Sequence, residues 1–352
     1  SYPDAASKGS DAVKAAISNA SPDENQRAMA AALKDADSAT VLLGNVATSH
    51  PQYSMLRALA QVIADCSGAT LGLLPEAANS AGGWLAGVLP HRGPAGAGVD
   101  NTGLNAADML SARLKAYVLF NVEPAHDCHD AAAASAAVEA ADFVVSISPF
   151  ASDATQAFAD VLLPIGPFTE TSGTFVNAEG RWQGFAGVAS PVGDSRPGWK
   201  VLRVLGNQFD LDGFVQTGTE EIRDALRAQC ESAALDNRQA DGPVAGAMQG
   251  SDLQRIGDVA ILSTDSLVRR AQSLQARPDG QVAGLLRINS STAENAGVRE
   301  GYRVRVSQGD ASVEMDVSID DRVTDGCVWL QSGTSASASL GAAFGPVTME
   351  RV

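Results

Sequence analysis

Short apolar runs alternate with stretches of helical periodicity through the first two thirds of the chain. Strand–helix–strand spacing of this kind makes parallel strand pairs. We therefore predict a parallel α/β region over residues 1–240, with a division into two lobes left open near residues 105–115. The expected strands are residues 39–44, 69–74, 115–121 and 142–148. One or two helices are expected within residues 11–36, and further helices are expected at residues 53–65, 131–141, 198–209 and 219–231.

Two details of this region can be checked directly. The stretch from Pro75 to Asn105 is rich in Gly, Pro and Asn and lacks periodicity, so we expect a long loop there. The helix at 53–65 is expected to bury one apolar stripe. The residues of that stripe are Met55, Leu56, Leu59, Val62 and Ile63.

The pattern changes after residue 233. Residues 233–256 are small, polar and aperiodic, which is typical of a linker. A helix is predicted at about 264–275, and apolar residues then alternate with period two through 302–306 and 313–319. We predict a separate C-terminal β domain over 257–352.

The stretch 159–183 is the first candidate site. A strand at Val161–Leu163 is expected to stop at Pro164, because proline has no backbone N–H to donate. A turn-forming polar run follows, and Gly173 and Gly180 permit positive φ or close backbone approach. Loops at the carboxyl ends of parallel strands are common ligand sites.

The sequence ADVLLPIGPFTETSGTFVNAEGRWQ at 159–183 resembles the signature of the molybdopterin oxidoreductase superfamily. Within that superfamily, the chain looks most like the C-terminal part of the G subunit of NADH-quinone oxidoreductase, the large iron–sulfur subunit of respiratory complex I. The resemblance implies a Rossmann-like parallel sheet followed by a C-terminal β-barrel of the double-psi type. The segments that favour this branch are PEAANSAGGW (75–84), LFNVEP (119–124), FVVSISPF (143–150), PGWKVLRVLGN (197–207) and GDVAILSTDSLVRRAQSLQ (257–275).

In molybdenum-containing members, the matching loop lies close to the pterin dinucleotide, so the resemblance implies a vestigial pterin groove. Its candidate residues are Thr171, Gly173, Thr174, Asn177 and Glu179. The alternative, which we favour, is a structural loop whose polar groups bond to one another. Many molybdenum members close over the pterin with a C-terminal His–Trp pair and a terminal Lys, whereas residues 332–346 contain no His, Lys or Arg. We therefore expect no catalytic residue, no cofactor and no molybdenum in this chain.

His126, Cys128 and His129 place three possible metal donors within four residues. Structural zinc sites usually draw ligands from two places in the sequence, and no second pair is evident. We expect a polar loop with one buried thiol. Arg269–Arg270 is either an interface anchor or a solvated helix face, and we favour the solvated face.

Composition narrows the class of protein. At 352 residues with a net charge of −16, the chain is long enough for several domains, and its acidity argues against nucleic acid or an anionic membrane surface as partner. No apolar run approaches the roughly 20 residues of a membrane span. The four cysteines, Cys66, Cys128, Cys230 and Cys327, form no CxxC, so we expect buried free thiols. The resemblance implies 2Fe–2S and 4Fe–4S clusters in a Cys-rich region upstream of Ser1, which we interpret as a fragment boundary.

Three functional hypotheses follow. In the first, the chain is a cofactor-free structural part of an enzyme that oxidises NADH and reduces quinone. Its partners would be other peripheral-arm subunits, on the cytoplasmic side of a bacterial inner membrane, and the fragment itself would be soluble. In the second, it belongs to an active molybdenum enzyme such as a formate dehydrogenase. In the third, it is a detached module that binds a small ligand in the old pterin groove.

Overall fold

The structure is a computed structural model that describes residues 11–233 and 253–352. These residues form two compact units. The N-terminal unit runs to Ala81 and also takes in Ala178–Gly180. The main unit comprises Gly82–Asn177, Arg181–Ser232 and residues 253–352. Most of the predicted linker at 233–256 lies outside the described residues, and its position as a domain boundary stays a prediction.

The N-terminal unit packs helices against two parallel strands. Asp23 caps helix α3 with a reciprocal bond to Gln26, and Gly68 ends α5 in a left-handed conformation with φ 75°. The core of this unit is formed by Ala60, Ala64 and Leu71. The elements are α2 (Asp11–Ser18), α3 (Glu24–Asp35), β1 (Thr40–Leu43), α4 (Asn45–Thr48), α5 (Tyr53–Ser67) and β2 (Thr70–Leu73).

Helix α5 confirms the predicted element, but its predicted apolar face only in part. It buries Ala60, Val62 and Ala64, whereas Ile63, a member of the predicted stripe, is 45% exposed. Val62 of the predicted stripe is buried, while the small side chains of Ala60 and Ala64 form the core of this unit with Leu71 of β2. The expected loop at 75–105 is also partly wrong, because it contains helix α6 (Ser80–Leu85) and the 3₁₀ turn η1 (Pro94–Gly96).

The main unit begins with a four-stranded parallel sheet of order β3-β4-β5-β8. Helix α9 covers one face, where Ala137 and Val138 pack against Tyr117 and Val144. The sheet consists of β3 (Ala116–Phe120), β4 (Phe143–Ser148), β5 (Val161–Gly166) and β8 (Arg196–Pro197). Its helices are α7 (Ala106–Ser111), α8 (Pro124–Asp127), α9 (Ala131–Glu139) and α10 (Asp153–Phe158).

Proline does not end the third of these strands. Pro164 lies within β5 opposite Ser148 of β4, and the strand continues to Gly166. The expected stop at Pro164 is therefore wrong. Beyond the sheet, the chain forms η2 (Phe168–Glu170), the antiparallel hairpin β6 (Gly173–Val176) and β7 (Trp182–Phe185), and helices α11 (Gly198–Gln208) and α12 (Thr219–Glu231).

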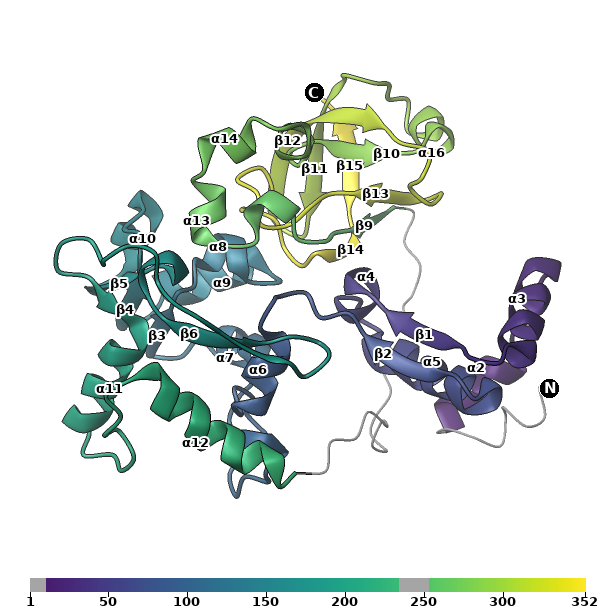
Figure 1. Cartoon of the computed structure of the whole chain (residues 1–352). Coiled ribbons are helices and arrows are strands. Elements are labelled where there is room, and N and C mark those ends of the chain that lie inside the picture. The colour runs from purple at the N-terminus through teal and green to yellow at the C-terminus, as the bar shows by residue number, and fades with distance from the viewer. Residues whose placement is uncertain (1–10, 234–252) are drawn as a thin grey trace. The chain divides into compact units, whose positions relative to one another are not determined.

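The rest of the main unit is a barrel-like sheet of seven strands in the order β14-β9-β13-β10-β12-β11-β15 (Figure 1). Its core is aliphatic and includes Leu286, Val304 and Leu330. The strands are β9 (Gln254–Ile256), β10 (Leu286–Ile288), β11 (Arg303–Gln308), β12 (Ala311–Ile319), β13 (Cys327–Trp329), β14 (Phe344–Pro346) and β15 (Thr348–Arg351). The predicted fold class, a parallel α/β region followed by a C-terminal β-barrel, is confirmed.

Two expectations for this region are corrected. Gln254–Ile256, which falls in the predicted linker, forms strand β9 between β14 and β13 of the sheet. The predicted helix at 264–275 is broken, because Ala271 has an extended ψ of 91° between two short helices. The helices of this part are η3 (Ile261–Ser263), α13 (Ser266–Arg269), α14 (Gln272–Gln275), α15 (Pro278–Val282) and α16 (Ser290–Asn295).

Two further observations concern the whole described chain. All four cysteines are free, but none is fully buried as expected, because Cys66 is exposed and Cys128, Cys230 and Cys327 are half-buried. Within residues 11–233 and 253–352, no helix combines the length and the apolar character needed to cross a membrane.

Candidate functional site

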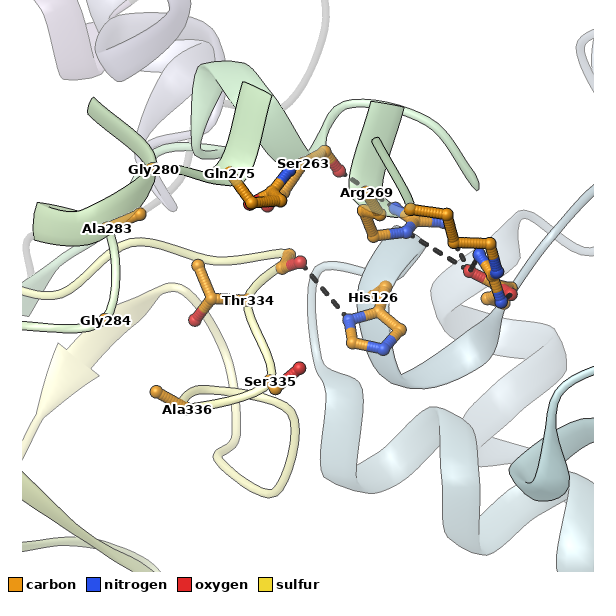
Figure 2. A pocket seen from close by; sticks show the side chains of 13 residues that line it. His126, Ser263, Arg269, Gln275, Gly280, Ala283, Gly284, Thr334, Ser335 and Ala336 are labelled. Carbon is orange, nitrogen blue, oxygen red and sulfur yellow. Dashed lines mark hydrogen bonds and ion pairs between the residues drawn. The ribbon is translucent and has the colours of Figure 1, made fainter. Parts of the chain in front are cut away.

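A cavity of about 430 Å³ lies inside the main unit, where the α8 segment meets the helices and loops of the barrel. Glu123 and His126 line it from the parallel-sheet side, and Arg269, Arg270 and Thr334 line it from the barrel side. Figure 2 shows the labelled His126, Arg269 and Thr334 around the cavity. The cavity therefore joins segments that are far apart in the sequence. It is the best candidate site in the part of the chain that the structure describes.

The backbone places Glu123 at the carboxyl edge of the parallel sheet. After β3, Asn121 adopts a left-handed φ of 53°, a conformation that asparagine tolerates better than most residues. Pro124 occupies the first turn of α8, and the Glu123 N–H donates to the Asp127 carboxylate at 2.7 Å. This turn holds the Glu123 and Asp127 side chains next to each other.

The barrel side contributes two arginines from one short helix. Asp265 caps α13 by accepting the N–H groups of Leu267 and Val268. The helix ends after a single turn, so Arg269 and Arg270 lie together at its C-terminal end. The cap and the early end of the helix together fix the positions from which the Arg269 and Arg270 side chains leave the backbone.

The four charged side chains of these two segments form a largely buried ion-pair network. Arg269 lies 2.8 Å from Glu123 and 2.8 Å from Asp127, and Arg270 lies 2.5 Å from Glu123. The side chains of Arg269 and Glu123 are each only 8% exposed. Arg270 also lies over the ring of Phe150, in the loop after β4, at 4.4 Å. The expectation of a solvated face is wrong for Arg269, whose side chain is buried, whereas Arg270 stays 34% exposed, and both arginines pair with residues from the other half of the chain.

The network sets the protonation of its members. Burial alone raises the pKa of Glu123, but hydrogen bonds and charge from Arg270 and Arg269 outweigh it, so this pKa lies below its ordinary value. Burial lowers the pKa of Arg269, but hydrogen bonds and charge from Asp127 and Glu123 more than reverse that effect. Both groups are therefore charged at neutral pH, as a buried pair must be to hold together.

His126 contacts the opposite wall of the cavity. Its Nδ1 lies 3.2 Å from the carbonyl oxygen of Gly333 (Figure 2). Burial, followed by the positive charge of Arg269, lowers the pKa of His126 below its ordinary value of 6.5. The ring is then neutral at pH 7, and the proton on Nδ1 donates to the carbonyl, which leaves the lone pair on Nε2.

The small-residue loop at 332–346 is fastened to the α8–α9 segment through the backbone. The Ala132 N–H donates to the Leu340 carbonyl at 3.1 Å, and the Ala343 N–H donates to the His129 carbonyl at 3.2 Å. Asp130 and Ala342 form an isolated antiparallel bridge between these bonds. The loop thus continues the contact between the parallel-sheet part and the barrel beyond the cavity.

Arg255 holds the same loop from inside the barrel. The residue is 2% exposed, and its guanidinium donates to the carbonyls of Gly341 and Ala342 and to the side chains of Gln308 and Ser332. Burial lowers its pKa to about 10. Sequence reasoning misses this residue, because it lies in the stretch predicted as a linker.

The five predicted pterin-groove residues do not line the cavity. Thr171 precedes the β6–β7 hairpin, Gly173 and Thr174 lie on β6, and Asn177 and Glu179 lie at its turn. The Asn177 carboxamide accepts the Arg181 N–H at 2.9 Å, and the Thr171 hydroxyl donates to the Ser172 carbonyl at 3.2 Å. These bonds are of the kind expected for a structural loop, and the vestigial pterin-groove role of the five residues stays a prediction.

The predicted metal candidates are also dispersed. No group of three or more His, Cys, Asp or Glu side chains within the described ranges is placed to hold a metal ion. His126 is bonded to Gly333, and burial together with the charges of Asp127 and Asp130 raises the pKa of Cys128 to about 11. A thiol with such a pKa stays protonated at neutral pH and is a poor metal ligand.

Comparison with known proteins agrees with this architecture. Residues 24–208 match the molybdopterin oxidoreductase family, and residues 264–349 match the molydopterin dinucleotide binding domain. The chain belongs to the molybdopterin oxidoreductase family. Among solved structures, acetylene hydratase from Pelobacter acetylenicus has a similar fold, with a TM-score of 0.50, 12% sequence identity, and coverage of 71% of this chain and 47% of that one.

Curated relatives come from more than one branch of the family. The NADH-quinone oxidoreductase G subunit of Mycobacterium tuberculosis (strain CDC 1551 / Oshkosh) is 29% identical over 306 residues, which cover 78% of this chain and 37% of the relative. A putative formate dehydrogenase of Staphylococcus aureus (strain USA300) is 40% identical over 92 residues, which cover 26% of this chain and 9% of the relative. The chain thus spans well under half of the length of these relatives.

The family implies a pterin dinucleotide as cofactor. The donors and charges of the cavity residues can be compared with what this cofactor needs. The pyrophosphate of such a ligand needs available N–H donors or uncompensated positive charge. Every N–H of Arg269 already has an acceptor, namely Glu123, Asp127 or the Ser263 carbonyl. The two carboxylates and two guanidinium groups of the network carry no net charge. In this arrangement, Arg269 and the neutral ion-pair network offer no free donor of their own to the pyrophosphate of the family's cofactor.

Proposed function

We propose that this chain is the C-terminal part of the G subunit of an NADH-quinone oxidoreductase and that it serves as a cofactor-free scaffold. The parent assembly would oxidise NADH and reduce quinone, with electrons passing through iron–sulfur clusters bound elsewhere in the subunit. The mycobacterial relative, which covers 78% of the chain, supports the branch. The single observation that carries the cofactor-free role is the neutralisation of Arg269 by Glu123 and Asp127.

A scaffold must keep its parts in fixed positions, and the contacts around the cavity suit that task. The ion-pair network joins the loop after β3 to helix α13, and the backbone bonds of His129 and Ala132 join the parallel-sheet part to the 332–346 loop. Arg255 then anchors that loop within the barrel. A body fixed in this way can support neighbouring peripheral-arm subunits without taking part in electron transfer.

The proposed location follows from the proposed assembly. The full-length subunit would belong to a membrane-associated complex and lie on the cytoplasmic side of a bacterial inner membrane, with no membrane insertion of its own. The finding that no described helix could cross a membrane is compatible with this position.

The proposal is tested on the purified chain and on the assembled complex. Molybdenum analysis by mass spectrometry and pterin fluorescence after oxidation should both give less than stoichiometric signal for the wild-type chain. Arg269→Leu, introduced into the full-length subunit, should lower the amount of assembled complex while the NADH:quinone activity per assembled complex stays unchanged. A lowered activity per complex would contradict the scaffold role.

A second candidate function is supported by the putative formate dehydrogenase relative. Under that alternative, the chain would be part of an active molybdenum oxidoreductase. The full-length protein would then carry molybdenum in a stoichiometric amount and reduce an artificial electron acceptor with formate as donor. Both measurements separate the two candidates, because the scaffold proposal expects neither signal.

A further inference from the structure

The Glu123 carboxylate is held in the way that proteins usually hold a phosphate or sulfate. Its Oε2 accepts from Arg269 Nε at 3.2 Å, Arg269 Nη2 at 2.8 Å and Arg270 Nη1 at 3.2 Å. Its Oε1 accepts from Arg270 Nη2 at 2.5 Å. Paired guanidinium forks on one anion are a preferred arrangement for recognising phosphate as well as carboxylate.

This carboxylate belongs to the wall of the cavity. Glu123, Arg269 and Arg270 all line the same space of about 430 Å³. Figure 2 shows the labelled Arg269 among the side chains around that space. Removing the carboxylate would therefore open its place to the cavity rather than leave a sealed void. An oxyanion of similar charge could reach the two guanidinium groups through that space.

The charge count determines what would bind there. With Glu123 present, two carboxylates balance two guanidinium groups. Without it, Asp127 still pairs with Arg269, but among the described residues Arg270 keeps only the Ser266 carbonyl and the Phe150 ring. One uncompensated, half-buried positive charge would then face the cavity. His126, with its lowered pKa, adds no charge at pH 7.

We propose that the cavity is an oxyanion site in which the protein's own Glu123 carboxylate takes the place of the anion, and that a phosphate-type oxyanion binds once this carboxylate is removed. Glu123 is thus the residue that sets the specificity of the cavity against phosphorylated ligands. The inference rests on the proposed function, because it presumes that no pterin dinucleotide occupies the cavity of the wild-type chain.

The test uses the full chain and inorganic phosphate as the probe. Melting temperatures of the wild type and of Glu123→Ala are measured in sodium phosphate and in sodium chloride of equal ionic strength. Phosphate should raise the melting temperature of Glu123→Ala and leave that of the wild type unchanged. Titration calorimetry should show that Glu123→Ala binds phosphate at least about tenfold more tightly than the wild type does. The reason is that hydrogen bonds to charged groups are among the strongest.

Further variants serve as controls for this test. Glu294→Ala removes an exposed carboxylate of α16 outside the network and should behave as the wild type, which excludes an effect of net charge alone. Glu123→Ala combined with Arg270→Gln should lose the response to phosphate. If Glu123→Ala does not fold, Glu123→Ser also vacates the place of the carboxylate and should give the same response to phosphate.

The outcomes are distinguishable. An equal response of the wild type and the folded Glu123 variants to phosphate, or no response in either, overturns the inference. A response that survives Arg270→Gln also overturns it. Stoichiometric pterin in the wild-type chain instead overturns the proposed function, and this result comes from a different measurement on a different sample.

Discussion

Arg269 lies 146 residues from Glu123 in the sequence, and the two side chains meet in an ion pair of 2.8 Å that is almost closed to solvent. This pair connects the carboxyl edge of the parallel sheet with the helices that lead into the barrel. Because a buried charge is costly when it loses its partner, both residues depend on the contact between the two parts of the main unit. The ion pair is therefore a sensitive probe of that contact.

Arg269→Leu should destabilise the chain strongly. The substitution leaves Glu123 with Arg270 alone and deprives Asp127 of its ion-pair partner. Breaking a buried ion pair by removing one partner costs about 3–5 kcal/mol. Urea unfolding followed by circular dichroism measures the change. The matched control is Arg303→Leu, which removes an exposed ion pair with Asp316 and should cost about 0–1 kcal/mol. Equal losses in the two variants would contradict the buried network.

The same network predicts a dependence of stability on pH. The pKa of Glu123 lies below its ordinary value of 4.5 in the folded chain, so the unfolded chain takes up the proton first as the pH falls. The stabilisation is then fully present above about pH 4.5 and is lost as the pH falls through the folded pKa. Unfolding free energies measured from pH 7 to pH 3 should show this decline. Glu123→Gln should give a shallower decline, whereas Glu294→Gln, outside the network, should follow the wild type.

Arg255→Leu tests the anchoring of the 332–346 loop. The change removes the donor to the carbonyls of Gly341 and Ala342 inside the barrel and leaves these oxygens without that partner. Hydrogen exchange of the backbone N–H groups at 340–343 should become faster, by at least about tenfold if the loss reaches 1–3 kcal/mol. Arg255→Lys keeps the charge but only three donors, so an intermediate effect is expected. Unchanged exchange would show that the backbone bonds to α9 suffice.

The elements of the parallel region are predictable because each depends on a local pattern. The runs at 115–121 and 142–148 appear as β3 and β4, and the intervening helical pattern appears as α9. Strand β9 escapes prediction because its three residues, Gln254–Ile256, are too few to show a period and include a buried arginine. A single charged residue within a polar stretch carries no local sign of burial.

The site is less predictable than the fold, for a physical reason. The one acidic residue near the two arginines is Asp265, four residues before Arg269, and this spacing is compatible with a surface pair on a solvated helix. In the structure, the Asp265 carboxylate instead accepts two backbone N–H groups of α13. The partners Glu123 and Asp127 are brought to the arginines only by the packing of the parallel-sheet part against the barrel. Long-range charge pairing leaves no trace in local periodicity.

The last prediction concerns Asn177, which the signature stretch places at the turn of the β6–β7 hairpin. Its side chain accepts the Arg181 N–H at 2.9 Å, and its own N–H donates to the Arg181 carbonyl at 3.2 Å. Asn177→Ala removes the first bond and keeps the second. Because this turn is open to water, the freed N–H can be solvated, and the cost should be about 0.5–1.5 kcal/mol, the net worth of one hydrogen bond.

This cost appears as a lower melting temperature of the ligand-free chain if the loop is structural. Gln183→Ala on β7 removes an exposed side chain from the same hairpin and serves as the matched control, with little expected change. If the stretch serves mainly to bind a ligand, Asn177→Ala should instead leave the empty chain's melting temperature unchanged or raise it, because binding residues are often not optimised for stability. An unchanged melting temperature joined to loss of pterin or nucleotide binding would contradict the scaffold role of this stretch.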